Sequence, residues 1–433
     1  MGFVFCNLEH RFLLYHTALL YYNLNCHIAN PIMSKIDTSQ QKINDFLERG
    51  VKEAISRDSV IKKLTRGEPL RVKHGVDPSG QDLHLGHASV YLKLRDLQDL
   101  GHKVVFLIGG FTGRFGDPTD KAKARTLKTK KETESASKDY VKQISRLLDI
   151  RKLEIRNNSE WYDGMDAEEL LKIMANLTVD QMLERDMFQE RKKRNEPVHL
   201  HEIVYPVLQG YDSVMLKSDL TVIGTDQVFN ENVGRDLQKK YGQEPQDIVA
   251  IDILTGTDGV NKMGKSLNNY ISLTESPTEQ FGKVMSIPDS QIIPYFTLAT
   301  RVDFSRVKEM ERALSGNSAN PMDLKMDLAQ EIVRMYNSEK DAVSAREDFK
   351  NTFSRKEAPE EIKSVRINKD SASLIDLVIS SGLVNSKTEA RRLIQDGAVD
   401  VGGEAKKDPE ETISLDKELI LKIGKHRFVK ITK

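Results

Sequence analysis

Apolar residues recur at two different spacings between positions 36 and 76. Residues 36–56 place Ile43, Leu47 and Val51 four positions apart, which predicts one amphipathic helix. Residues 70–76 alternate apolar with polar side chains instead, a pattern typical of a strand. Glycine, proline and aspartate follow at once, and we expect them to end the strand in a loop.

A second helix and a second strand are expected after this loop. Residues 84–100 carry Val90, Leu94 and Leu97 on one helical face. Residues 104–108 form an unbroken apolar run, which is typical of a strand buried on both faces of a parallel sheet. The order strand, helix, strand therefore predicts an α/β fold.

The alternation of strands and helices continues to about residue 254. Further strands are expected at 153–156, 220–223 and 248–254. We therefore predict a Rossmann-like domain with a mostly parallel sheet over residues 33–277. Ligands of such sheets bind at the carboxyl ends of the strands. The loops expected there, which are rich in glycine and polar residues, are 77–87, 109–125 and 224–230.

Beyond this domain the pattern changes three times. Residues 278–353 predict helices without clear strands, so we expect an α-helical domain. Residues 354–372 are highly charged, and we interpret them as a linker. Residues 373–433 carry two short helical patterns followed by a glycine-rich strand-and-turn pattern, which predicts a small α+β domain.

Composition limits the classes to which this protein can belong. Among 433 residues, 65 lysines and arginines balance 65 aspartates and glutamates. This balance excludes a uniformly basic nucleic-acid coat, so any nucleic acid must be bound by local patches. No apolar run reaches the roughly 18 residues of a membrane span, so we expect no membrane contact. Two cysteines supply neither a disulfide scaffold nor a cysteine-based zinc site, and we expect no fixed metal site.

Both cysteines, Cys6 and Cys26, lie in residues 1–32. That segment is rich in aromatic residues, and its only charged residues are Glu9 and Arg11. It lacks the basic start and small-residue cleavage site of a secretory signal, and it lacks the many arginines of a mitochondrial presequence. We interpret it as an upstream extension outside the fold, arising from an early assigned start codon. A targeting or partner-binding segment is the alternative.

Two histidines stand at the expected start of a helix, in the motif His84-Leu85-Gly86-His87. A spacing of three residues puts both on one face, and the glycine lets a ligand approach the backbone. A helix N-terminus offers free N–H groups and a partial positive charge, which suit a phosphate. The alternatives are a pair of structural histidines and metal ligation, for which no third ligand is spaced nearby.

A second motif, Lys262-Met263-Gly264-Lys265-Ser266, follows the last expected strand. Two mobile ammonium groups can follow the charge that develops as pyrophosphate departs. Residues 259–266 also match the P-loop pattern, but a P-loop needs a helix that opens at its lysine. The residues that follow include two asparagines, which are poor helix formers. Solvated loop lysines that bind no nucleotide are the other alternative.

The order and spacing of these two motifs resemble those of the class I aminoacyl-tRNA synthetases. Four further segments resemble the bacterial type of tyrosyl-tRNA synthetase, namely 75–80, 109–118, 205–212 and 224–227. The likeness extends from about residue 36 to the C-terminus. It implies that ATP, accompanied by Mg²⁺, activates tyrosine, which a cytoplasmic homodimer then transfers to the 3′-terminal adenosine of tRNA-Tyr. It makes residues 33–277 the catalytic domain and 278–353 the anticodon-side domain.

The resemblance also implies a role for each matching residue. Asp212 would accept a hydrogen bond from the phenol of the substrate. The residues implied to hold its ammonium group are Asp117, Tyr205 and Gln209. The residues implied to bind ATP or the adenylate are Asp77, Ser79, Gly86, Gly224, Asp226 and Gln227. The residues implied to stabilise the phosphates during catalysis are His84, His87, Lys262, Lys265, Lys121 and Arg125.

Two positions depart from the family's pattern. Lys73 stands where many members place a second phenol-reading tyrosine, and Asp180 stands where many place an amide. Because Lys73 replaces that tyrosine, Asp212 is expected to recognise the phenol with fewer helpers.

The C-terminal unit resembles a small RNA-binding module shared with a ribosomal protein. Its residues 419–433 include five basic and no acidic side chains. The residues expected to contact tRNA are Lys387, Arg391, Arg392, Lys425 and Arg427. Such contacts to phosphates give affinity and register rather than sequence readout. An ordinary solvated face is the alternative.

Three other functions are weighed against this one. A tryptophanyl-tRNA synthetase shares the catalytic fold, but the context of Asp212, the second histidine of the motif and the C-terminal module argue against it. A small-molecule nucleotidyltransferase would lack the RNA-binding module and the helical domain. An RNA-binding protein with an inactive catalytic domain is disfavoured by the intact histidine and lysine motifs.

Overall fold

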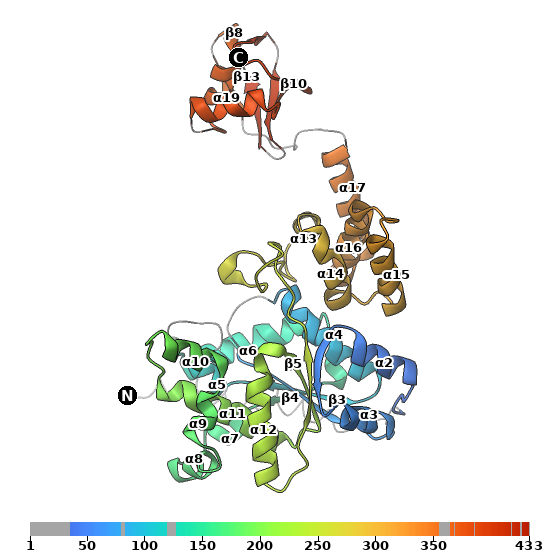
Figure 1. Ribbon diagram of the computed structural model, residues 1–433, viewed down its shortest axis with the longest axis vertical. Helices are drawn as coiled ribbons and strands as arrows, with labels where there is room; N and C mark the ends of the chain where they lie inside the picture. Colours follow the sequence, from blue (N-terminus) through green and yellow to red (C-terminus); the bar gives the residue numbers. More distant parts are fainter. Residues whose placement is uncertain are drawn as a thin grey trace, which may run out of the picture. The chain divides into compact units, whose positions relative to one another are not determined.

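The computed structural model describes the chain with several gaps. The described residues are 35–78, 83–118, 127–354, 364–367, 369–384, 386–416, 418–424 and 427–432. The extension expected at residues 1–32 lies outside them. The chain forms two compact units: one runs to Thr274 and takes in Ile287–Asn320, and the other comprises Glu275–Ser286 and the chain from Pro321 (Figure 1).

A six-stranded sheet forms the centre of the first unit. Its strands are β1 (Val51–Ile55), β2 (Arg71–Val76), β3 (Lys103–Ile108), β4 (Glu154–Asn157), β5 (Leu220–Gly224) and β6 (Asp247–Ile251). They are ordered β1-β6-β5-β2-β3-β4, and all neighbours run parallel except β1, which pairs antiparallel with β6. Strand β3 is buried along nearly its whole length, as expected for a strand covered on both faces. The predicted α/β fold with a mostly parallel sheet is confirmed.

The amphipathic helix expected over residues 36–56 is shorter than predicted. Helix α2 spans Gln40–Glu48, and strand β1 begins at Val51. Between them Gly50 has a φ of 63°, and a Cβ there would lie 2.4 Å from Leu298 Cδ2. This left-handed glycine and its close tertiary contact end the helix, although the apolar spacing continues through Val51.

Helices lie on both faces of the sheet. Those of the first unit are α2, α3 (Arg57–Thr65), α4 (Leu85–Asp99), α5 (Thr112–Phe115), α6 (Lys130–Ile144), α7 (Ser159–Tyr162), α8 (Ala167–Met174), α9 (Val179–Leu183), α10 (Asp186–Lys193), α11 (Leu200–Leu216), α12 (Val228–Lys240), α14 (Ile292–Ala299) and α15 (Phe304–Ser315). Its 3₁₀ turns are η1 (Ile150–Lys152), η2 (Thr225–Gln227), η3 (Lys265–Leu267) and η4 (Asp289–Gln291). The crossovers β2–α4–β3 and β5–α12–β6 leave in opposite directions along the sheet, so right-handed connections put α4 and α12 on opposite faces.

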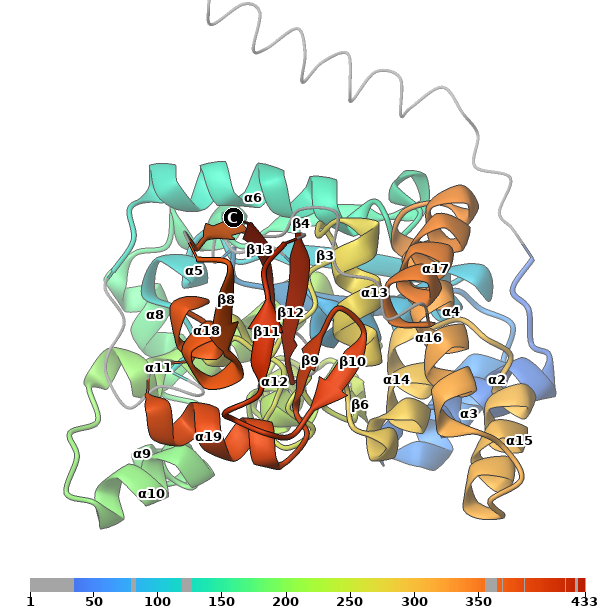
Figure 2. The same cartoon turned by 90° about the horizontal axis from the view of Figure 1, so that it is seen from above.

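The second unit contains a helical part and a β-rich part. Its helices are α13 (Pro277–Met285), α16 (Pro321–Tyr336), α17 (Glu339–Ser354), α18 (Leu374–Ser380) and α19 (Lys387–Gln395). Its strands are β7 (Ser364–Arg366), β8 (Ser371–Ser373), β9 (Val399–Val401), β10 (Glu404–Lys406), β11 (Thr412–Ser414), β12 (Leu419–Ile423) and β13 (Arg427–Thr432). A five-stranded sheet in the order β10-β9-β12-β13-β7 lies beside the pair β11-β8 (Figure 2). Apolar residues of α18, α19, β12 and β13 form one shared core, which confirms the α+β character predicted for this end of the chain.

No helix in the described part of the chain is long and apolar enough to cross a membrane.

Candidate active site

The order of strands in the central sheet reverses between the neighbours β2 and β5. Strand β2 leads to β3 on one side, and β5 leads to β6 on the other. Ligands of parallel sheets bind outside the carboxyl ends of the strands at such a switch point. Asp77 follows β2, Gly109 follows β3, and residues 225–227 follow β5. The three loops that the sequence marked as chemically rich therefore begin at one edge of the sheet.

Two hydroxyl groups fix the carboxylate of Asp77. Thr112 Oγ1 donates to Asp77 Oδ1 at 2.8 Å, and the Tyr205 hydroxyl donates to Asp77 Oδ2 at 2.7 Å. Burial raises the pKa of Tyr205 well above its usual value, so this hydroxyl keeps its proton. A Cβ on residue 109 would lie 2.1 Å from Asp77 Oδ1, so the absence of a side chain at Gly109 leaves room for the Asp77 carboxylate.

Asp117 joins two predicted motifs through its two oxygens. Asp117 Oδ2 accepts a hydrogen bond from Gln227 Nε2 at 2.8 Å, although the two residues are 110 positions apart. Asp117 Oδ1 accepts from Arg185 Nη2 at 3.1 Å, and the Arg185 side chain is 5% exposed. Sequence reasoning missed Arg185, which lies just before α10 and belongs to none of the recognised motifs.

Asp212 is buried on helix α11, where two side chains donate to it. Trp161 Nε1 donates to Oδ1 at 3.1 Å, and Asn158 Nδ2 donates to Oδ2 at 3.3 Å. Burial raises the pKa of Asp212 to about 7, against the opposing effects of the positive charge of Lys73 and of these hydrogen bonds. Sequence reasoning missed Asn158 and Trp161. Their position directly after β4, a strand that was predicted, was the signal that could have identified them.

The two histidines of the first motif lie side by side at the start of α4. Their ring centroids are 3.9 Å apart, and the backbone N–H of His84 donates to His87 Nδ1 at 3.3 Å. Burial, with added repulsion from neighbouring positive groups, lowers the pKa of His87 to about 4 and that of His84 further still. Both imidazoles are therefore neutral at pH 7. His84 Nδ1 is buried and has no hydrogen-bond partner within the described residues.

The two lysines of the second motif lie in a tight loop rather than a P-loop. The residue that follows Gly264 opens only the 3₁₀ turn η3, which ends at Asn268 with a φ of 52°. Asn269 holds the loop closed, because its Oδ1 accepts from the backbone N–H of Gly264 at 2.9 Å and its Nδ2 donates to Asp258 Oδ2 at 3.0 Å. The P-loop alternative is wrong, because no α-helix begins at Lys265.

The loop with the two lysines packs directly on the histidine motif. The backbone N–H of Leu85 donates to the Ile271 carbonyl at 3.0 Å, and a Cβ on Gly86 would lie 3.5 Å from Met263 Cβ. Lys262 Nζ forms an ion pair with Asp226 Oδ2 at 2.9 Å, which ties the loop to the end of β5. The histidine motif, the lysine motif and the β5 loop are thus gathered in one place.

The remaining predicted residues lie elsewhere. Ser79, Lys121, Arg125 and Lys425 lie outside the described residues. In the second unit, Arg391 and Arg392 are exposed on α19, and the 73% exposed side chain of Lys387 lies 3.7 Å from Asp376. Arg427 Nη1 donates to the Leu383 carbonyl at 2.9 Å. No group of three or more histidine, cysteine, aspartate or glutamate side chains within the described ranges could hold a metal ion.

Comparison with family models gives two adjoining matches. Residues 65–354 match the model of the tRNA synthetases class I (W and Y), and residues 354–431 match that of the tyrosine–tRNA ligase SYY-like C-terminal domain. The first match alone covers more than half of the chain.

Two bacterial proteins illustrate the similarity of sequence. The tyrosine–tRNA ligase of Thermotoga maritima is 44% identical over 387 residues, which cover 89% of this chain and 96% of that protein. The tyrosine–tRNA ligase of Moorella thermoacetica is 42% identical over 390 residues, with 89% and 94% covered.

Solved structures share the fold at lower identity. Tyrosyl-tRNA synthetase of Archaeoglobus fulgidus, complexed with L-tyrosine, has a TM-score of 0.58 at 23% identity and covers 71% of this chain and 99% of its own. A C-terminally truncated mitochondrial tyrosyl-tRNA synthetase of Coccidioides posadasii has a TM-score of 0.57 at 22% identity, with 78% and 99% covered. With the family match and the bacterial relatives, these findings show that the chain belongs to the class I tRNA synthetases of the W and Y family, in the group of the bacterial tyrosine–tRNA ligases.

Proposed function

We propose that this protein activates tyrosine with ATP to tyrosyl-adenylate and then transfers the tyrosyl group to the 3′-terminal adenosine of tRNA-Tyr. The observation that carries this proposal is the buried carboxylate of Asp212, which Trp161 and Asn158 hold by one hydrogen bond to each oxygen. A carboxylate has about four acceptor positions, so it can also accept a hydrogen bond from a phenol.

Discrimination against phenylalanine follows from the same carboxylate. Phenylalanine has no hydroxyl group to donate to Asp212, which is 4% exposed. Binding of phenylalanine would therefore exclude water from a charged carboxylate without supplying the hydrogen bond that a phenol gives it, and this costs free energy.

The ammonium group of the amino acid needs acceptors, because it has only donors. Asp117 supplies a carboxylate, which also accepts hydrogen bonds from Arg185 and Gln227. The Tyr205 hydroxyl donates its proton to Asp77, so its oxygen lone pairs can accept. Gln209 Oε1 accepts a single hydrogen bond, from Asn230 Nδ2 at 2.8 Å. These three groups support the role that the motifs imply.

Adenylation requires charge stabilisation more than proton transfer. The tyrosine carboxylate is already a nucleophile, so it can attack the α-phosphorus of ATP in line without a general base. Negative charge then develops on the departing pyrophosphate. The neutral imidazoles of His84 and His87 can donate N–H groups to phosphate oxygens, and the ammonium groups of Lys262 and Lys265 lie in the loop packed on them.

Further parts of the proposal come from the family. Lys121 and Arg125 would assist the lysines, Ser79 would assist the histidines, and Asp77, Gly86, Gly224 and Asp226 would line the ATP side. Mg²⁺ would arrive with ATP rather than occupy a protein site. The basic residues of the C-terminal part would contact tRNA phosphates. The protein would act as a homodimer in the cytoplasm, where translation consumes its product.

Pyrophosphate exchange tests the first half of the reaction. The assay would be run with ATP and each of the 20 amino acids in turn, followed by aminoacylation of tRNA-Tyr with labelled tyrosine. We expect tyrosine to support exchange far better than any other amino acid and the tRNA to be charged. Exchange that tryptophan supports best, or exchange without any charging of tRNA, would contradict the proposal.

A further inference from the structure

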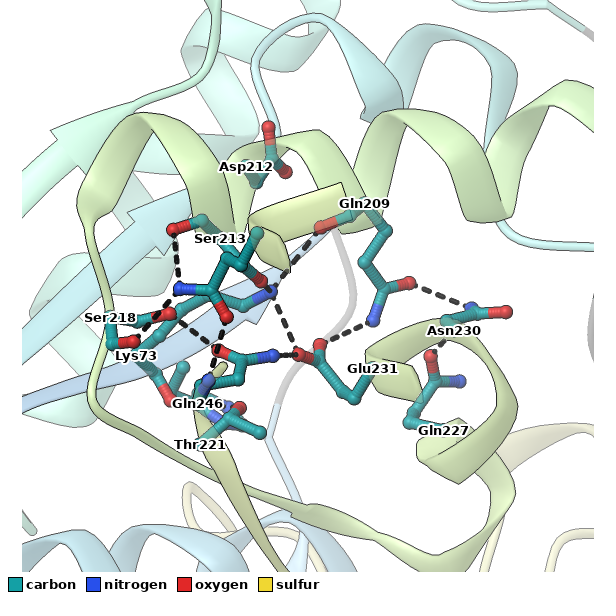
Figure 3. A network of polar contacts seen from close by, with 12 residues as sticks. Lys73, Gln209, Asp212, Ser213, Ser218, Thr221, Gln227, Asn230, Glu231 and Gln246 are labelled. Carbon is teal, nitrogen blue, oxygen red and sulfur yellow. Dashed lines mark hydrogen bonds and ion pairs between the residues drawn. The ribbon is translucent and has the colours of Figure 1, made fainter. Parts of the chain in front are cut away.

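A buried ion pair joins the sheet to helix α12 beneath the amino-acid side of the site. Lys73 Nζ lies 2.9 Å from Glu231 Oε2, and both side chains are 1% exposed (Figure 3). Burying two charges costs a large desolvation free energy, so such a pair is weak evidence for a gain in stability. Its presence calls for a role other than holding the fold together.

Lys73 uses all its donors away from the phenol side. An ammonium group has three N–H donors. Besides Glu231, they reach Ser213 Oγ at 2.6 Å and the Gln209 carbonyl at 3.3 Å. In Figure 3 no hydrogen bond or ion pair connects Asp212 to this network. Lys73 therefore cannot donate to the phenol, although many family members use this position for that purpose.

Glu231 determines which way two amide side chains face. Gln209 Nε2 donates to Glu231 Oε1 at 2.8 Å, and Gln246 Nε2 donates to Glu231 Oε2 at 2.7 Å. An ionised carboxylate only accepts, so each amide must turn its NH₂ group toward it. The oxygen of Gln209 is then directed the other way, where Asn230 Nδ2 donates to it at 2.8 Å.

A second carboxylate fixes the other end of this chain of amides. Gln227 Nε2 donates to Asp117 Oδ2 at 2.8 Å, so Gln227 Oε1 is left to accept from Asn230 Nδ2 at 3.1 Å. The two directions meet at Asn230, whose NH₂ group donates to both glutamines. We call these five residues, Asp117, Gln227, Asn230, Gln209 and Glu231, the amide relay.

The central amide shows that the relay has one permitted direction. Asn230 is fully buried, and its Oδ1 has no hydrogen-bond partner within the described residues. Turning Asn230 over would direct this oxygen at the oxygens of Gln209 and Gln227, while the carboxylates at both ends prevent those two glutamines from turning with it. A buried acceptor without a partner costs free energy. The unpaired oxygen of Asn230 is therefore a cost of the arrangement in which its NH₂ group donates to Gln209 and fixes the orientation of that side chain.

We propose that Glu231, neutralised by Lys73, is a positioning residue that makes Gln209 present its oxygen rather than its NH₂ group to the ammonium group of tyrosine. This inference rests on the proposed role of Gln209. If the Gln209 amide were turned over, its NH₂ group would face the ammonium group of tyrosine, and two hydrogen-bond donors would be in contact without an acceptor. The pair would therefore contribute to recognition of the ammonium group without donating a hydrogen bond to the phenol.

Competitive inhibition of pyrophosphate exchange by two ligands tests this proposal. One ligand is tyrosinol, which keeps the ammonium group and the phenol, and the other is 3-(4-hydroxyphenyl)propionate, which keeps the phenol but lacks the ammonium group. In Glu231→Gln we expect the inhibition constant of tyrosinol and the KM for tyrosine to rise about tenfold. The inhibition constant of the propionate and the preference for tyrosine over phenylalanine should stay within about twofold. Equal weakening of both ligands, or of neither, would overturn the proposal.

A double variant guards against a folding defect. In Lys73→Met/Glu231→Met both charges are removed together, which is often tolerated where removing one partner is not. It should show a larger loss for tyrosinol than for the propionate, because loss of the Lys73 charge near Asp212 affects both phenol-bearing ligands alike. In a Gln209→Leu background, Glu231→Gln should cause no further loss of tyrosinol affinity, because the residue that it positions is absent. An additional tenfold loss there would contradict the proposal.

A matched control is available in another buried pair of the same unit. Lys63 lies 3.2 Å from Asp247, with side chains 5% and 3% exposed. Lys63→Met should lower the melting temperature but leave both inhibition constants unchanged. Exchange by the wild-type protein separates this proposal from the proposed function. If the wild-type protein showed no tyrosine-dependent exchange, the proposed function would be contradicted. If it showed normal exchange but Glu231→Gln weakened both inhibitors equally, only the amide relay would be contradicted.

Discussion

The proposed amino-acid end of the site and its proposed phosphate end differ in burial and in secondary structure. At the amino-acid end, Asp212, Glu231 and Asn230 are almost completely buried, and their orientations are set by interlocking hydrogen bonds. At the proposed phosphate end, the Lys262 side chain is 45% exposed, and its loop contains only the short 3₁₀ turn η3. Selection among similar amino acids needs groups that cannot rearrange, whereas charge that develops during a reaction can be met by cations that move toward it.

The largest effect should come from a substitution at the amino-acid end of the site. In Asp212→Ala we expect the preference for tyrosine over phenylalanine, measured as a ratio of kcat/KM in pyrophosphate exchange, to fall about a hundredfold, because the buried acceptor is lost. Asp180→Asn, an exposed substitution on α9, is the control and should leave the ratio unchanged. A preference that survives in Asp212→Ala would show that another residue recognises the phenol.

A substitution at the phosphate end should lower the rate of adenylate formation instead. Lys265→Ala is expected to lower the rate of adenylate formation by about tenfold to a hundredfold in single-turnover experiments, because one cation that stabilises the departing pyrophosphate is missing. The dissociation constant of tyrosine should change by less than about twofold. Lys240→Ala, at the exposed end of α12, should change neither quantity. Parallel losses of rate and tyrosine affinity would argue against the separation of the two ends.

The two ends should also differ in their response to pH. The pKa of Asp212 is raised to about 7, so in the free protein its carboxylate takes up a proton as the pH falls through 7. We expect kcat/KM for tyrosine to drop about tenfold between pH 8 and pH 6, as the fraction of ionised Asp212 falls. The histidines should add no inflection above pH 5, because the pKa of His87 is about 4 and that of His84 is lower. An inflection near pH 7 that persists in Asp212→Asn would contradict this assignment.

The smallest effect is expected from the C-terminal part. Arg391→Ala removes one exposed positive charge from α19. In the structure, Arg391 Nη2 lies 3.2 Å from Glu410 Oε1. We expect KM for tRNA to rise about twofold to fivefold at low salt and less at high salt, because a single phosphate contact is lost. Pyrophosphate exchange, which needs no tRNA, should be unchanged. A loss of exchange activity would contradict the assignment of Arg391 to tRNA binding.

The sequence predicted much of the fold because its signals were local. The alternation at 70–76 and the apolar run at 104–108 each marked a strand, and both are present as β2 and β3. Where a local signal competed with tertiary packing, the prediction was wrong: the apolar spacing continued through Val51, but Gly50 and its contact with Leu298 end the helix first.

The candidate site was predictable only in part, for a related reason. Residues in motifs at the ends of strands, such as Asp77 and Asp117, are brought together by the topology of a parallel sheet. Arg185 and Glu231 act through contacts with residues far away in sequence, so no spacing marks them. Lys73 was recognised as a departure from the family's pattern, but its partner on α12 could not be deduced without the structure.

Pyrophosphate exchange with tyrosine and phenylalanine, compared between the wild-type protein, Asp212→Ala and Lys265→Ala, examines the division of the site most directly. We expect the wild-type protein to prefer tyrosine strongly, Asp212→Ala to lose that preference while retaining exchange, and Lys265→Ala to keep the preference at a lower rate. If the two substitutions reduced rate and preference alike, recognition and charge stabilisation would not be divided between the two ends.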